Sequence, residues 1–178
     1  METPKQNSTK IAFKWALISL VTSIVLTYVW QLLNVNPTSP VTYGGFIFFI
    51  AFLLFVQKEY RDQLGGFITF GEAFLSGFLF SVFAGIMTAI FIFIYYSYLS
   101  PQIYQLTLDA QRAAMEAKGA SSDQIDQTMG IMNKYGKILT LIGGIVFTPI
   151  VGAVIALIGA AIFKKERSIF DIENNPTE

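Results

Sequence analysis

Three long stretches of this chain contain no charged side chain. They cover residues 15–57, 73–108 and 138–163 and hold 43, 36 and 26 residues. Charged residues make up only 13% of the 178 residues, compared with about 25% in soluble domains. A soluble fold of this size would leave much of that apolar surface in water. The sequence therefore predicts an integral membrane protein.

The uncharged stretches predict four membrane-spanning helices. Such a helix needs about 20 mostly apolar residues, so the first stretch is long enough for two. The turn-forming run at residues 34–40, with two prolines and two asparagines, divides it. We expect an all-α fold with spanning helices at about residues 11–33, 41–56, 70–99 and 138–163.

The first predicted helix has an alternative interpretation as a secretory signal peptide, because Lys5, Lys10 and Lys14 precede it. Its apolar run is longer than the roughly 7–15 residues usual for such peptides, and no small-residue cleavage motif follows it. We therefore favour a retained helix.

The one sizeable polar region outside the predicted spans predicts an external helical hairpin, at about residues 101–137. Apolar residues recur there at helical spacing. Gly119 is a natural helix end, and Ser121 with Gln124 fits a capping box that begins a second helix. We treat 100–137 as an insert in a single membrane domain that comprises the whole chain. The polar tail at 168–178 is expected to be disordered.

The distribution of basic residues predicts the orientation. If the N-terminus is cytoplasmic, the cytoplasmic segments carry eight Lys or Arg and the external segments carry four. Cytoplasmic loops of membrane proteins have an excess of Lys and Arg. We therefore expect both termini in the cytoplasm.

Small residues recur every four positions on two of the predicted helices. The 70–99 helix carries Ala73, Gly77, Ser81, Gly85 and Ala89, and the 138–163 helix carries Gly144, Thr148, Gly152, Ala156 and Ala160. Such ridges let helix backbones approach closely in lipid. They predict packing of these two helices within one chain or, alternatively, contact with a second copy or another membrane protein.

Three further residues are candidates for function. Glu72 stands in the first turn of a predicted helix, where the helix dipole favours an acid; the alternative is a cation or proton site, paired with Lys14. Pro149 removes the donor to the carbonyl of Ile145 and predicts a kink, which is either static or a hinge.

The composition also excludes much chemistry. The chain has no Cys and no His, which excludes thiolate nucleophiles, Cys/His zinc sites and Ser-His-Asp triads. The formal net charge is zero, which argues against binding to nucleic acid. We find no catalytic, metal or cofactor motif and expect a non-enzymatic protein without a cofactor.

The segment from Tyr60 to Phe74 carries a resemblance to a known family. Its distinctive residues are Gly65, Gly66, Phe70, Gly71 and Glu72. With the Ser121–Ile125 segment and the Gly/Ala-rich last helix ending in Lys164-Lys165, they resemble a family of bacterial membrane proteins, the domain of unknown function 4199 (DUF4199). The resemblance covers nearly the whole chain and implies the bacterial inner membrane, but it brings no activity or partner.

These patterns favour an accessory or scaffold protein of the inner membrane that acts through helix–helix contacts. Its expected partners are the lipid bilayer and either a second copy or another membrane protein. The alternative is a small transporter or channel component with Glu72 and Lys14 near the path.

Overall fold

A computed structural model describes residues 7–36 and 39–166. Its helices are α1 (Ser8–Leu32), α2 (Gly44–Gln63), α3 (Phe70–Ile94), α4 (Pro101–Ala117) and α5 (Ser122–Phe163), with a 3-10 turn at Pro40–Tyr43 and a π-helical turn at Tyr95–Leu99. The predicted disordered tail at 168–178 lies outside the described residues.

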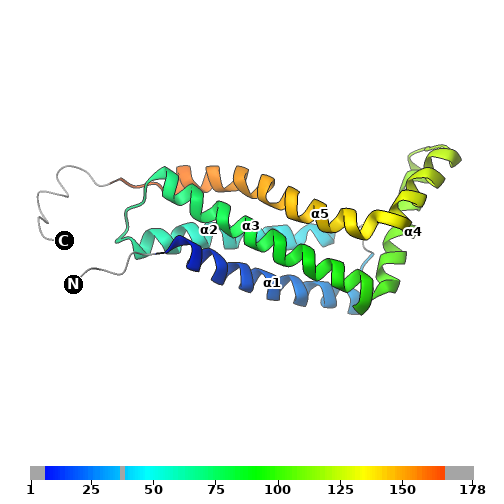
Figure 1. Ribbon diagram of the computed structural model, residues 1–178, viewed down its shortest axis with the longest axis horizontal. Coiled ribbons are helices and arrows are strands. Elements are labelled where there is room, and N and C mark those ends of the chain that lie inside the picture. The colour runs from blue at the N-terminus through cyan, green and yellow to red at the C-terminus, as the bar shows by residue number, and fades with distance from the viewer. Residues whose placement is uncertain (1–6, 37–38, 167–178) are drawn as a thin grey trace, which may run out of the picture.

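Four helices of the described part are long and apolar enough to cross a membrane: α1, α2, α3 and α5. Figure 1 shows them as an elongated bundle, with α4 standing across one end. We call this the hairpin end and the opposite end, where α2 turns into α3, the turn end. The expected all-α fold of four spanning helices with an external helical hairpin is confirmed.

Three helices end in the same way, with one residue in the left-handed backbone conformation. These residues are Asn34 after α1, Gly65 after α2 and Gly119 after α4, with φ of 51°, 78° and 77°. In each case the next amide donates to the carbonyl five residues earlier, as from Val35 to Trp30 at 2.9 Å. This is the Schellman motif, which pairs carbonyls that a helix end leaves free.

Two helices are longer than the predicted spans. α2 continues to Gln63 instead of ending near residue 56, because charged side chains past the apolar run pair along the helix, as Lys58 does with Asp62 at 3.1 Å. α5 begins at Ser122, so the second arm of the hairpin and the fourth span are one helix of 42 residues. The capping box of Ser121 and Gln124 is present at its start, as predicted.

The two small-residue ridges face each other across the α3–α5 interface. A Cβ added to Gly144 would lie 2.8 Å from the Cβ of Ala89, and a Cβ added to Gly85 would lie 2.9 Å from that of Thr148. The opposed pairs are Ala89 with Gly144, Gly85 with Thr148, Ser81 with Gly152, and Gly77 with Ala156. The register is antiparallel, and the ridges pack within one chain.

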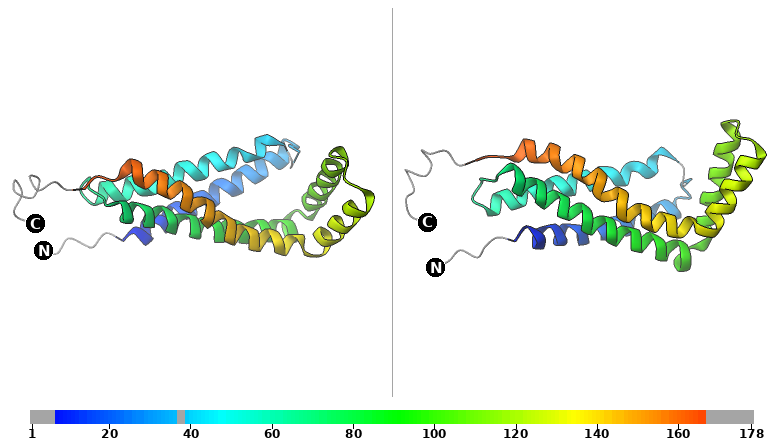
Figure 2. Two further views of the ribbon diagram at one scale, coloured as in Figure 1. Left: turned by 90° about the horizontal axis from the view of Figure 1, so that it is seen from above. Right: turned by 45° about the horizontal axis from the view of Figure 1, so that its top comes forward.

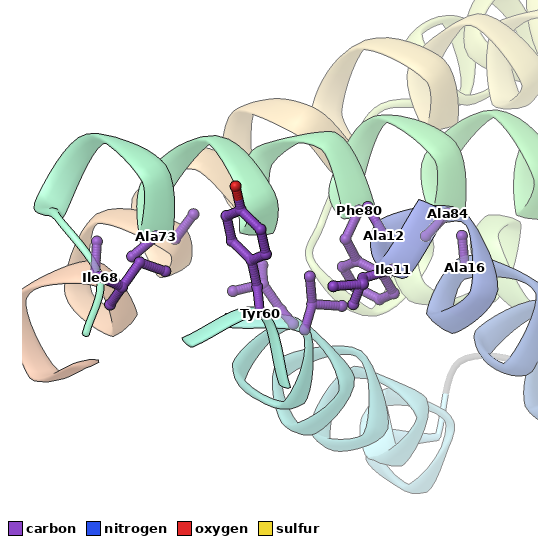
Figure 3. Close-up of a cluster of buried hydrophobic side chains, with 12 residues drawn as sticks. Ile11, Ala12, Ala16, Tyr60, Ile68, Ala73, Phe80 and Ala84 are labelled. Atoms are coloured by element: carbon purple, nitrogen blue, oxygen red, sulfur yellow. The ribbon is translucent and has the colours of Figure 1, made fainter. Parts of the chain in front are cut away.

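The buried core lies towards the turn end and is built largely of small side chains. Ala12 and Ala16 of α1 lie beside Phe80 and Ala84 of α3 there, and Ala73 lies further along α3 near Ile68 (Figure 3). The buried residues of α2 begin at Leu53, at the middle of the helix, and none lies before it. In Figure 2, α2 lies away from α3 and α5 at the hairpin end, whereas α1 still contacts the end of α3 there through Gln31 and Tyr95. The bundle is therefore tightly packed at one end and open at the other.

Two glycines of α5 test the α3–α5 interface. A Cβ on Gly152 would overlap the side chain of Ser81, whereas a Cβ on Gly143 meets nothing within 4 Å. Both substitutions by Ala gain helix propensity, so Gly152→Ala isolates the clash. We expect it to lower the free energy of unfolding in detergent by about 1–3 kcal/mol, with Gly143→Ala neutral or stabilising. Equal effects of the two variants would contradict this packing.

Candidate functional site

The glycines of the 65–72 segment turn the chain out of α2. Gly65 and Gly66 have φ of 78° and 87°, which side-chain-bearing residues rarely adopt. The amide of Gly66 donates to the carbonyl of Arg61 at 3.0 Å, and that of Gly65 to the carbonyl of Asp62 at 3.2 Å. These two glycines are thus required by the geometry of the turn.

The same segment binds the chain that leaves α5. Ile68 and Lys165 form an antiparallel bridge, in which each amide donates to the other's carbonyl at 2.9 Å. The ammonium of Lys165 lies 5.1 Å from the centre of the Phe67 ring, within range of a cation–π contact. Ile68 is buried. The turn end is therefore closed by backbone pairing between two segments far apart in the sequence.

Glu72 serves as a helix cap in this structure. Its carboxylate accepts from the amide of Thr69 at 2.9 Å and from its hydroxyl at 2.8 Å, and the hydroxyl oxygen accepts from the Glu72 amide at 3.3 Å. This is a capping box, which satisfies donors at the start of α3. Phe70 is exposed in the first turn of α3, and nothing in the structure explains a glycine at position 71.

The proposed pairing of Glu72 with Lys14 is wrong, because Lys14 pairs with Glu59. The ammonium lies 2.5 Å and 2.6 Å from the two carboxylate oxygens of Glu59. The carboxylate also accepts from Nε1 of Trp15 at 2.7 Å and from Nε2 of Gln63 at 3.0 Å. This cluster joins α1 to α2 at the turn end. Sequence analysis missed Glu59 because it ended the second helix before it.

Gln57 is a second polar residue that sequence analysis missed. Its side chain is completely buried between α2, α3 and α5. Nε2 donates to the backbone carbonyls of Ala73 at 3.1 Å and Ala156 at 2.8 Å. Gly77 and Gly159 leave the space that this amide occupies, and Oε1 faces Gly159 without a hydrogen-bond partner. One amide thus ties three membrane-spanning helices together.

Pro149 lies inside α5, which stays a continuous α-helix on both sides of it. In Figures 1 and 2, the most visible bend of α5 lies in its yellow part next to α4, and not in the orange part that contains Pro149. The hinge at Pro149 therefore stays a prediction.

The base of the hairpin is fixed by Tyr104 of α4. Its hydroxyl donates to the backbone carbonyl of Met132 at 2.6 Å. A Cβ on Gly136 would overlap that hydroxyl, so the glycine admits the tyrosine. A tyrosine hydroxyl is protonated at neutral pH and able to donate, and burial raises the pKa of Tyr104 further above its ordinary value.

The described residues contain no group of three or more acidic side chains that could hold a metal ion. The polar clusters join helices, and the fold defines a class: a polytopic α-helical membrane protein with a helical hairpin at one end of its bundle. The chain belongs to the DUF4199 family, described as proteins of unknown function, whose profile matches residues 14–165. No curated protein and no solved structure matches the chain.

The contacts of Gln57 generate a prediction. Gln57→Leu removes two hydrogen bonds between helices, each worth about 0.6 kcal/mol on average in membrane proteins. We expect the free energy of unfolding in detergent to fall by roughly 1 kcal/mol. Gln105→Leu, at an exposed position of α4, is the control and should change it by less than about 0.5 kcal/mol. If Gln57→Leu is as stable as the unchanged protein, the amide does not tie the helices.

Proposed function

We propose that this protein is a non-enzymatic accessory protein of the bacterial inner membrane, which binds another protein through its hairpin. Both termini then lie in the cytoplasm, and the hairpin lies on the periplasmic side. The distribution of basic residues supports this orientation.

The α3–α5 interface is not the surface that a partner would contact. Its ridges are occupied within the chain, so a partner has to contact other residues. The charged candidates Glu72 and Lys14 act in a helix cap and an ion pair. This arrangement favours an accessory role over the alternative of a transport path along these two residues.

Exposed apolar side chains on the hairpin are the main support for a protein partner. Ile131 and Tyr135 lie one helical turn apart on α5, outside the predicted span 138–163, and are each 48% exposed. The ammonium of Lys134 lies 5.0 Å from the Tyr135 ring. Arg112 of α4 and Asp126 of α5 pair at 2.5 Å and hold the two arms together. Apolar side chains on a braced projection are typical of a surface that contacts another protein.

Photo-crosslinking tests this surface. A photoreactive phenylalanine analogue at Ile131 should give a discrete protein adduct in native membranes. The same analogue at Ile158, an exposed residue within the span, should not, because lipid surrounds it. The mass of the adduct distinguishes a second copy from another membrane protein. Absence of a protein adduct at Ile131 would remove the support for this role.

The orientation has a separate test, because the chain contains no native cysteine. Gln127→Cys in the hairpin should react with a membrane-impermeant maleimide on intact spheroplasts. Lys58→Cys at the turn end should react only after the membrane is permeabilised. The reverse pattern would place both termini outside the cytoplasm.

A further inference from the structure

A cavity occupies the open half of the bundle. Its volume is about 450 Å³, and it lies between α1, α2, α3 and α5. It exists because α2 is buried only from Leu53 onwards, so its N-terminal half leans away from α3 and α5 (Figure 2). Ligand pockets in proteins have volumes of about 300–1,000 Å³.

A second cavity of about 390 Å³ lies beside it, towards the hairpin. The two share four lining residues: Thr27, Trp30, Thr42 and Ile92. The second is also lined by Ile103, Leu106 and Ala110 of α4. We call the two cavities together the cleft. It begins beside α4 and continues between the membrane-spanning helices.

The lining of the deeper part of the cleft is mostly apolar, with Ser and Thr hydroxyls among it. Four aromatic rings of α2 line it, those of Phe46, Phe48, Phe49 and Phe52. The hydroxyls of Thr22 and Thr27 donate to the carbonyls of Ile18 and Ser23 on their own helix, at 2.9 Å and 2.8 Å. Among the described residues that line the two cavities, none is Asp, Glu, Lys or Arg. A charged ligand group would therefore be desolvated there without a counter-charge, at a high cost in free energy.

Two side chains that line the cavity next to the hairpin, Trp30 and Gln31, carry hydrogen-bond donors. Oε1 of Gln31 accepts from the hydroxyls of Tyr95 at 2.7 Å and Ser100 at 3.4 Å. Nε2 of the Gln31 amide therefore points away from these two hydroxyls. Within the described ranges, neither that nitrogen nor Nε1 of Trp30 has an acceptor. Trp30 lies about 22 Å along α1 from Trp15, a distance that places the two indoles at opposite membrane interfaces, where tryptophan is enriched. The ester carbonyls of lipids lie at this depth.

We propose that the cleft binds one uncharged acylglycerol. An ester carbonyl accepts from Trp30 and Gln31, and the acyl chain lies along the phenylalanines of α2. From Trp30 down to Ser19, the deepest residue of α1 in the lining, the cleft extends about 16 Å along the helix, which accommodates most of a long acyl chain. The uncharged lining selects against an anionic lipid. This binding site does not depend on the proposed protein partner.

The first test locates the ligand on the unchanged protein. The full chain is placed in phosphatidylcholine nanodiscs with a monoacylglycerol that carries a diazirine in its acyl chain, and the adducts are mapped by mass spectrometry. We expect adducts at the cleft-lining positions of α1 and α2. Adducts spread over lipid-facing positions of all helices would overturn the proposal, since that is the pattern of a lipid shell.

The second test fills the cleft. Thr88→Phe places a ring in the deeper cavity, whereas Ile90→Phe places the same ring on the exposed face of α3. We expect Thr88→Phe to reduce labelling at least tenfold and Ile90→Phe to leave it unchanged. If Thr88→Phe does not fold, Thr27→Phe replaces it, because Thr27 lines both cavities. Equal labelling of filled and control variants would overturn the proposal.

The third test addresses the chemistry of the ligand. Unlabelled monoolein should compete with the probe, and oleate, which has the same chain and a negative charge, should compete at least tenfold more weakly. Trp30→Phe keeps an aromatic ring but loses the donor, so it should weaken labelling severalfold. Equal competition by the two lipids would overturn selection for an uncharged ligand, and unchanged labelling of Trp30→Phe would overturn the assignment of the donor.

Discussion

The close approach of α3 and α5 is the contact on which the rest of the bundle depends. Lipid tails are as apolar as the side chains they surround, so helices in a membrane gain little from hiding apolar surface. Association has to come from contact between backbones, and a row of Gly, Ala, Ser and Thr on each helix permits it. α1 and α2 pack against this closely packed pair of helices.

Polar contacts add specificity to this packing and concentrate at the turn end. The amide of Gln57, the carboxylate of Glu59 and the bridge between Ile68 and Lys165 each join segments that the sequence separates widely. The hairpin end has fewer such ties, chiefly the contact of Tyr95 with Gln31 and that of Tyr104 with Met132. The cleft lies where these ties are sparse, which is why α2 can stand apart from the bundle there.

The helices could be predicted from the sequence because lipid imposes one rule on every spanning segment: it has to be long and nearly free of charge. The ridges were visible as well, since every fourth residue was small. Gln57 and Glu59 were missed because hydropathy ended the second helix at Val56, and their partners depend on the register between helices. Tyr104 was missed because its contacts with Gly136 and the carbonyl of Met132 depend on how α4 and α5 pack against each other.

The bond from Gln57 to Ala156 bears on the order in which the protein assembles. These residues are 99 positions apart, so α1, α2 and α3 are synthesised before the second acceptor of the amide exists. The partner of Ile68 is made later still, at Lys165. A nascent chain that stops short of α5 therefore has an α2 in which Gln57 can bond to Ala73 but not yet to Ala156. The last helix to leave the ribosome completes the ties of α2, and the chain that follows it completes those of the turn before α3.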